Sequence, residues 1–347
     1  MPEVFGRKYE VYIGLPTELI YKHTTPVGKI GVPPALIAEM NVKNPKVGIG
    51  GLSSLTGGYI DYVTIPKKVI KIDSYSGQNP LQFEAEISYN KNPAGGKAAP
   101  AKIKLYNLNK ETLSYAQKDA AMIIKAGYVQ DKVLPLIYVG QIISSKTQRD
   151  DNGNNITEIV CGDAIVPIKM VKFSGSYSAN TTHNKMIGDV MDVFAQNGVP
   201  KGIFKATDRT RYENNSARNF VGTAAGTLDT LCKEIDYTWY VTKGKLNVMP
   251  KERPRTGKLI EVYGNNIIGK VELSTNNAST SSNSPDSTTS GVKFKMFLDG
   301  NIDNTVDVSI KEGDFKGDYS VDSVDFKLDF YGTDWYTEVE ASVGRTD

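Results

Sequence analysis

A mainly β fold, with two β-barrel domains flanking a small α+β module, is predicted by two features of the sequence. Apolar and polar residues alternate at both ends of the chain, and this alternation sends side chains to the two faces of a strand. Helical spacing of apolar residues is confined to the middle. The 347 residues also exceed the usual length of one domain. We therefore expect domains at residues 1–165, 166–255 and 256–347.

In the first part of the chain, residues 81–89 alternate most regularly, with every odd position apolar or aromatic and every even position polar. A strand separates such a pattern onto two faces, whereas a helix would spread it around its surface. The turn-forming residues 149–154 suit the tip of a hairpin. The same alternation predicts further strands at residues 69–73, 101–106, 135–144 and 156–161.

Residues 109–129 are open to two interpretations. Asn109 is a good helix cap, so a helix begins after it. We favour a short helix that ends near Gln117, followed by a strand over residues 121–129, because the apolar run in that stretch suits a sheet. The alternative is a single helix that continues to Gly127.

The middle part, residues 166–255, is predicted to be a compact α+β module. Gly198 stops its first helix, and Thr227 caps a second helix at residues 228–235. The first helix spans residues 184–197, where apolar side chains form one stripe: Met186, Ile187, Val190, Met191 and Phe194.

A hairpin is expected next, with strands at residues 237–242 and 245–249 and its turn at Lys243-Gly244. Residues 274–291 are almost entirely Ser, Thr and Asn, so they have no apolar face to bury and should form a mobile loop or linker. Alternation then returns and predicts strands at residues 292–298, 305–310, 319–321, 324–330 and 335–341.

Residues 26–58 form a long Pro- and Gly-rich segment. A loop of that length without structure is unusual inside a compact domain. It is predicted to be either an extended arm that contacts a partner or a partly ordered insertion.

The charges of the chain are nearly balanced. Lys and Arg number 41 and Asp and Glu number 39, giving a net charge of +2, so no global field recruits nucleic acid or an anionic membrane. No apolar run has the roughly 18 residues of a membrane span, and residues 1–8 lack the pattern of a signal peptide. We therefore expect no membrane insertion by this chain and synthesis in a cytoplasm.

Few residues suggest catalytic or metal chemistry. His23 and His183 are far apart, and Cys161 and Cys232 are isolated, so the spacing of a zinc site or a disulfide framework is missing. Both cysteines suit buried positions; a Cys–His nucleophile pair is the alternative. We expect no catalytic site, no metal and no cofactor.

Three other patterns have ordinary structural explanations. Residues 48–51 match a dinucleotide-binding loop poorly. Glu84 and Glu86 share a strand face, where alternation itself demands polar residues; a glycosidase pair is the alternative. A set of lysines suits a solvated face that protects sheet edges, or else a polar lumen or a docking surface for an acidic partner: Lys67, Lys68, Lys71, Lys91, Lys97, Lys102 and Lys104.

Several blocks occur in a characteristic order at residues 85–90, 100–108, 124–128, 137–142 and 157–163. This order resembles the first barrel of tail hub proteins from contractile phages and phage-derived bacteriocins, a broad family that includes late control protein D. Residues 228–232, 237–241 and 244–246 are similar to the middle module of that family, and residues 317–321 and 334–337 are similar to its closing strands. The resemblance covers most of the chain from about residue 69, and residues 26–58 and the Ser/Thr/Asn loop depart from it.

This resemblance implies a structural baseplate hub. Such a hub is a homotrimer with two similar barrels per chain, and its pseudo-sixfold ring joins the sixfold tail tube to the threefold central spike. The implied partners are the tail tube or tube-initiator protein, the spike and the baseplate wedge proteins, with the tape measure protein as a further candidate. The implied location is the baseplate of a virion or tailocin assembled in a bacterial cytoplasm.

Three rival interpretations remain at this point. Another tail subunit, such as a distal tail or tail-tip protein, shares the β-rich pattern but would form hexameric rings or carry a receptor-binding head. A glycosidase or peptidoglycan hydrolase acting on a cell wall is a second. The third is a carbohydrate-binding β-sandwich, for which Trp239 and Trp335 are few and lie within predicted strands.

Overall fold

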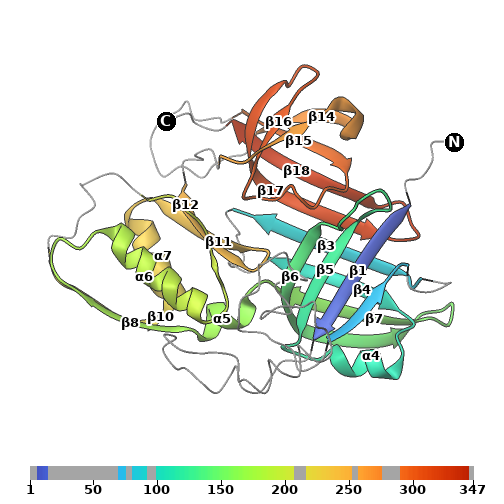
Figure 1. Cartoon of the computed structure of the whole chain (residues 1–347), viewed down its shortest axis with the longest axis horizontal. Helices are drawn as coiled ribbons and strands as arrows, with labels where there is room; N and C mark the ends of the chain where they lie inside the picture. The colour runs from blue at the N-terminus through green and yellow to red at the C-terminus, as the bar shows by residue number, and fades with distance from the viewer. Residues whose placement is uncertain are drawn as a thin grey trace.

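The chain is mainly β with few helices, as the sequence predicted (Figure 1). One thirteen-stranded sheet contains strands from both ends of the chain, and the middle forms an α+β module with two small sheets. The predicted arm at residues 26–58 and residues 276–289 of the predicted loop lie outside the part of the chain that the structure describes. This computed structural model describes residues 6–14, 69–75, 80–91, 99–206, 216–251, 257–275 and 290–343.

The first part of the chain supplies one half of the large sheet. Across this half the strand order is β3-β4-β7-β6-β5-β1-β2, with antiparallel neighbours throughout. Burial alternates along β3 as apolarity does in the sequence. The bounds are β1 (Arg7–Gly14), β2 (Val69–Asp73), β3 (Phe83–Asn90), β4 (Pro100–Tyr106), β5 (Ala121–Tyr128), β6 (Leu136–Arg149) and β7 (Asn155–Gly162).

This half of the sheet curls until its distant strands face each other. Strands β1 and β3 are separated by four others in the sheet, yet the rings of Tyr9 and Phe83 stack with centroids 4.8 Å apart. The Tyr9 hydroxyl also donates to the backbone oxygen of Leu81 at 2.7 Å, just before β3. The concave side therefore closes around a common core, which is the shape expected of a barrel domain.

The last part of the chain supplies the other half, and the two halves are directly paired. Strand β17 pairs antiparallel with β3, so that Phe326 lies opposite Ile87, and the sheet continues as β17-β18-β15-β14 (Figure 1). Strand β16 pairs with β17 and β13. The bounds are β13 (Leu259–Val262), β14 (Ile267–Thr275), β15 (Ser290–Phe297), β16 (Asp307–Ile310), β17 (Gly317–Asp329) and β18 (Trp335–Val343).

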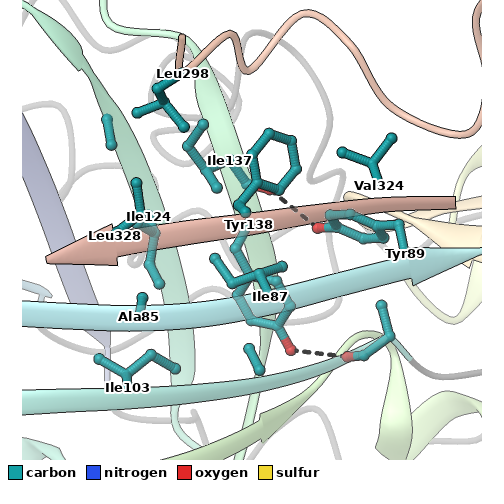
Figure 2. Close-up of a cluster of buried hydrophobic side chains, with 14 of the residues drawn as sticks. Ala85, Ile87, Tyr89, Ile103, Ile124, Ile137, Tyr138, Leu298, Val324 and Leu328 are labelled. Atoms are coloured by element: carbon teal, nitrogen blue, oxygen red, sulfur yellow. Dashed lines mark hydrogen bonds between the residues drawn. The ribbon is translucent and has the colours of Figure 1, made fainter. Parts of the chain in front are cut away.

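One hydrophobic core runs through both halves. Figure 2 shows Val324 of β17 beside Tyr89 of β3, and Leu328 near Ala85. The Tyr89 hydroxyl donates to the backbone oxygen of Ile137 at 3.1 Å. Each large apolar side chain buried in this way contributes about 1.5–3 kcal/mol. The two ends of the chain are thus stabilised together.

The middle of the chain builds a second core on two helices. Strands β11 and β12 pair antiparallel, and β9 pairs parallel to β12 at the edge. In Figure 1, β11 and β12 lie between these helices and the large sheet. The bounds are α5 (Ile165–Met170), β8 (Lys172–Tyr177), α6 (His183–Gln196), β9 (Lys201–Phe204), β10 (Arg218–Thr223), α7 (Ala224–Glu234), β11 (Tyr237–Thr242) and β12 (Lys245–Pro250).

Several sequence predictions are confirmed here. The stripe of α6 is fully buried, and its five apolar residues face the second core. The favoured interpretation of residues 109–129 is right: α4 (Lys110–Tyr115) is short, Asn109 caps it, and β5 follows. The hairpin tip at residues 149–154 is also present, with the Asp150 carboxylate accepting the backbone N–H of Asn154 at 2.7 Å.

Other predictions need correction. Helix α7 begins four residues earlier than expected, because the cap is Thr223, whose hydroxyl accepts the N–H of Gly226, while Thr227 lies inside the helix. The strands expected at residues 319–321 and 324–330 are one strand, β17, interrupted by a register shift between Val321 and Ser323. Strands β1, β8, β9, β10, β13 and β14 and helix α5 were not predicted.

Candidate functional site at the junction of the three parts

The turn of the β11–β12 hairpin lies at the junction between the two halves of the large sheet. Lys243 and Gly244 both have positive φ, 50° and 79°, which fits the tight turn predicted there. The backbone N–H of Gly244 lies 3.1 Å from a carboxylate oxygen of Asp163, which follows β7 and is completely buried. The turn is thereby bonded to the first half of the sheet.

The same hairpin is bonded to the second half through residues 300–304. The Lys243 ammonium donates to the Asp303 carboxylate at 2.8 Å and to the backbone oxygen of Gly300 at 2.7 Å. The Thr242 hydroxyl donates to the Asn304 side-chain oxygen at 2.6 Å. These bonds are buried, so the loop and the hairpin hold a fixed relative position.

Lys91, at the end of β3, completes the junction. Its ammonium donates to the Ser320 hydroxyl at 2.8 Å, and its backbone oxygen accepts from the Thr238 hydroxyl at 3.3 Å. Only 7% of Lys91 is exposed. This lysine belonged to the set predicted to lie on a solvated face, and for Lys91 that prediction is wrong, because its charge has buried polar partners.

Burial acts on the pKa values of two carboxylates at the junction, those of Asp163 and Asp303. Burial raises the pKa of Asp163 to about 7, and the backbone N–H groups of Gly244 and Lys243 only partly oppose this. Burial also acts to raise the pKa of Asp303, but the ammonium of Lys243 and the bonds from Thr305 outweigh it, so that pKa lies below its usual range. Asp163 therefore titrates near neutral pH, while Asp303 stays ionised.

A cleft of about 660 Å³ opens beside this junction. All three parts of the chain line it: residues 133–136 between β5 and β6, β9 with the hairpin, and residues 300–305. Among the described residues that line the cleft, one is acidic, Asp303, and five are lysines: Lys125, Lys201, Lys243, Lys245 and Lys258.

The structure keeps the histidine and cysteine candidates apart. His183 begins α6 in the middle module, where its Nε2 lies 2.7 Å from the Glu234 carboxylate that also binds Arg218. Cys161 lies in the core of the large sheet and Cys232 in the core of the module, both buried as predicted. Burial raises the pKa of the Cys161 thiol. His23 and residues 48–51 lie outside the described residues.

Each of the paired glutamates has its own partner. Glu84 accepts from the Tyr106 hydroxyl at 2.5 Å and from Lys104 at 3.0 Å, and Glu86 pairs with Lys327 at 2.8 Å. For Glu86, the bond from Lys327 lowers the pKa. The interactions of both glutamates connect neighbouring strands.

The two tryptophans are buried in strands, as expected. The indole N–H of Trp239 donates to the Asp229 carboxylate at 2.8 Å, and that of Trp335 donates to the backbone oxygen of Gly127 at 3.2 Å. The exposed fraction is 1% for Trp239 and 4% for Trp335. Neither indole face is therefore available to stack on a sugar ring.

In the described part of the chain, no group of three or more His, Cys, Asp or Glu residues is arranged to hold a metal ion. Nor does any helix described there have the length and apolar character needed to cross a membrane.

Sequence reasoning missed the residues that form the junction. Asp163, Lys243, Asp303 and Asn304 lie on three separate segments, and no local pattern connects them. The only available signal was the Lys243-Gly244 turn, which identified the hairpin but not its buried position.

Comparisons with solved structures identify this fold in phage tail proteins. The 43 kDa tail protein of prophage MuSo2 from Shewanella oneidensis is 9% identical, with a TM-score of 0.50 over 80% of this chain and 94% of that protein. A tail protein from Neisseria meningitidis MC58 is also 9% identical, with a TM-score of 0.50 over 78% and 94%. No family model and no curated protein matches the sequence.

A third structure extends the likeness to secretion systems. The Escherichia coli c3393 protein, a component of the type VI secretion system described as similar to the bacteriophage T4 tail proteins gp27 and gp5, is 8% identical. Its TM-score is 0.52 over 79% of this chain and 76% of that protein. The chain therefore has the fold that these tail proteins share, which confirms the predicted resemblance at the level of the fold.

Proposed function

We propose that this chain is a structural protein of a phage-type tail, and specifically the hub of a contractile tail baseplate or tailocin. The observation that carries the proposal is the shared fold, which extends over about four fifths of the chain and nearly the whole of two phage tail proteins. No enzymatic activity forms part of the proposal.

The hub is proposed to be a homotrimer. Its two barrel domains, residues 1–165 and 256–347, flank the module of residues 166–255, and three chains would present six barrels to a sixfold tube while keeping threefold symmetry toward a spike. Closed cyclic rings are the usual solution for such an adaptor. The direct β3–β17 pairing supports the idea, because it holds the two strand-rich halves of one chain in a fixed relation.

The partners in this proposal are the tail tube or tube-initiator protein, the central spike and the baseplate wedge proteins. The chain would act in the baseplate of a virion or tailocin after assembly in a bacterial cytoplasm. Among the lysines that could form a docking surface for an acidic partner, Lys104 already pairs with Glu84 within its own chain. Lys102 on the same strand remains a candidate for that contact.

Counting subunits in assembled particles tests the hub. Three copies per baseplate, matching the copies of the spike, are expected from quantitative mass spectrometry or electron cryo-microscopy of purified tails. Six copies per baseplate would contradict the hub and indicate a distal tail protein instead. A cell-wall zymogram addresses the rival enzyme: cleared peptidoglycan around the purified chain, absent from a heat-denatured control, would contradict a purely structural role.

A further inference from the structure

The lysines of the junction cleft are not all neutralised within the chain. Lys243 is paired with Asp303 at 2.8 Å, and Lys201 with Asp192 at 2.7 Å. By contrast, Lys125 and Lys258 form no ion pair with any residue that the structure describes. Two cationic side chains therefore face a cavity shared by three parts of the chain.

Lys125 is held in an unfavourable environment. It stands on β5, half-buried, and burial lowers the pKa of its ammonium, with Lys71 adding repulsion and Glu10 only partly opposing both. A bound anion in the cleft would compensate for the water that this ammonium has lost. The charged form of Lys125 is therefore more stable when an acidic ligand is bound in the cleft.

An edge strand of a sheet lines part of the cleft. Strand β9 is the outer strand of the order β11-β12-β9, and within the described residues it pairs with β12 alone. Lys201, Gly202 and Ile203 all line the cavity. An edge strand without a second partner has backbone groups that can pair with another extended segment, and here those groups belong to residues at the cavity.

From these features we propose that the cleft binds an extended acidic segment of a partner protein. The segment adds to the edge of β9 by backbone hydrogen bonds, and its carboxylates lie near Lys125 and Lys258. Residues 133–136, which also line the cleft, are apolar and suit the uncharged side chains of such a segment. Among the described residues, the lining contains no arginine fork and no aromatic ring, the groups that favour phosphates and nucleic-acid bases.

The occupant is assigned to a partner because the longest stretch outside the described residues, 15–68, carries six lysines and three acidic residues. Residues 252–256 are also net basic, and residues 276–289 carry a single acidic residue. The proposal goes beyond the hub function, since it concerns a site within one chain. Its test uses the isolated full chain and gives the same answer whatever the copy number in a particle.

The test is fluorescence anisotropy with labelled short peptides at low salt. A peptide of alternating Glu and Thr should bind. Its Gln–Thr counterpart should not, because it lacks the charges, and a Glu–Pro peptide of equal charge should bind more weakly, because proline cannot donate to a strand edge. The double substitution K125Q/K258Q should weaken binding of the Glu–Thr peptide about tenfold.

The matched control is K146Q/K316Q, which removes two exposed lysines that do not line the cleft. Its affinity for the Glu–Thr peptide should equal that of the unmodified chain. The proposal is overturned if both double variants bind alike, if the Glu–Thr peptide does not bind, or if oligothymidylate displaces it at lower concentration than unlabelled peptide. Circular dichroism checks that each variant is folded.

Discussion

The ammonium of Lys243 lies 2.8 Å from the carboxylate of Asp303, and 11% of each side chain is exposed. The two residues belong to different parts of the chain, since Lys243 forms the turn of the module hairpin and Asp303 lies in the loop between β15 and β16. Because a buried charge left without its partner is costly, this pair makes the position of the hairpin depend on the second half of the sheet.

The first prediction concerns this pair. The substitution K243M should lower the free energy of unfolding by about 3–5 kcal/mol, because it leaves the Asp303 carboxylate buried and unpaired. Thermal and urea unfolding measure the change. The control K185M removes an exposed lysine that pairs with Asp189 on α6, and it should cost only about 0.3–0.5 kcal/mol. Equal effects of the two substitutions would contradict the prediction.

A double variant separates the ion pair from packing. In K243M/D303N no unpaired charge remains, so much of the stability lost in K243M should return. If the double variant is as unstable as K243M, the lysine acts through its bond to Gly300 or its contacts rather than through Asp303.

The second prediction is a pH dependence carried by Asp163. Its pKa is about 7 in the folded chain against 3.8 as the ordinary value, so the folded state binds more protons between these values. The free energy of unfolding should therefore fall as pH rises from 3.8 to about 7, and this contribution should be constant above that. The substitution D163N keeps an oxygen that can accept the Gly244 N–H. It should remove this decrease in the free energy of unfolding, because the amide does not titrate.

The measurement is thermal unfolding from pH 5 to 8. Carboxylates with a lowered pKa, such as Glu84, act in the opposite sense, but only below their ordinary value of 4.5. The control D236N alters an exposed carboxylate, 66% exposed, and should keep the profile of the unmodified chain. Parallel profiles for D163N and D236N would show that Asp163 does not titrate in this range.

The extent to which the sequence predicted this architecture depends on local regularity. Strand β3 alternates without exception and was predicted to within two residues. Strand β14 was missed because Gly269, with φ of 83°, and a register shift break its pattern. The two-stranded ribbon of β8 and β10 is short and largely polar, so little of its pattern is apolar.

The buried contacts of the junction could not be predicted from the local sequence, because the residues that form them are far apart in the chain. Gly244 and Asp163 are 81 residues apart, and Lys243 and Asp303 are 60 residues apart. An aspartate or a lysine in a polar loop has the same local appearance whether it is solvated or buried. The pairing of β3 with β17 holds together the two halves of the sheet that supply these loops, and it joins segments that are far apart in the chain.

The third prediction tests the closure of the first half of the sheet. Tyr9 is completely buried against Phe83, so Y9A should cost about 3–5 kcal/mol. In a double-mutant cycle with F83A, the two rings should show a coupling of about 0.5–1.5 kcal/mol. Y9A combined with L228A, in the separate core of the module, should show additive costs. A vanishing Tyr9–Phe83 coupling would mean that β1 and β3 do not face each other.

The fourth prediction asks what holds β3 to β17. Lys327 and Glu86 form an ion pair across this seam, but their side chains are 32% and 61% exposed, so K327A should cost no more than about 1 kcal/mol. Phe326 is the neighbouring residue on the buried face, and F326A should cost about 3–5 kcal/mol. Urea titration compares them. A larger cost for K327A would make the seam electrostatic rather than hydrophobic.

The last prediction follows from the shared core. Since residues of β3 and β17 belong to one cluster, the two strand-rich halves should unfold as one unit, while the module opens separately around its own core. Native-state hydrogen exchange can resolve this. The substitution F326A should lower protection equally in β5 and β18 and less in α6, whereas L228A should lower it in α6 and β11 first. If F326A exposes β18 but leaves β5 protected, the halves are energetically independent barrels, because a continuous sheet with a common core cannot lose one side alone.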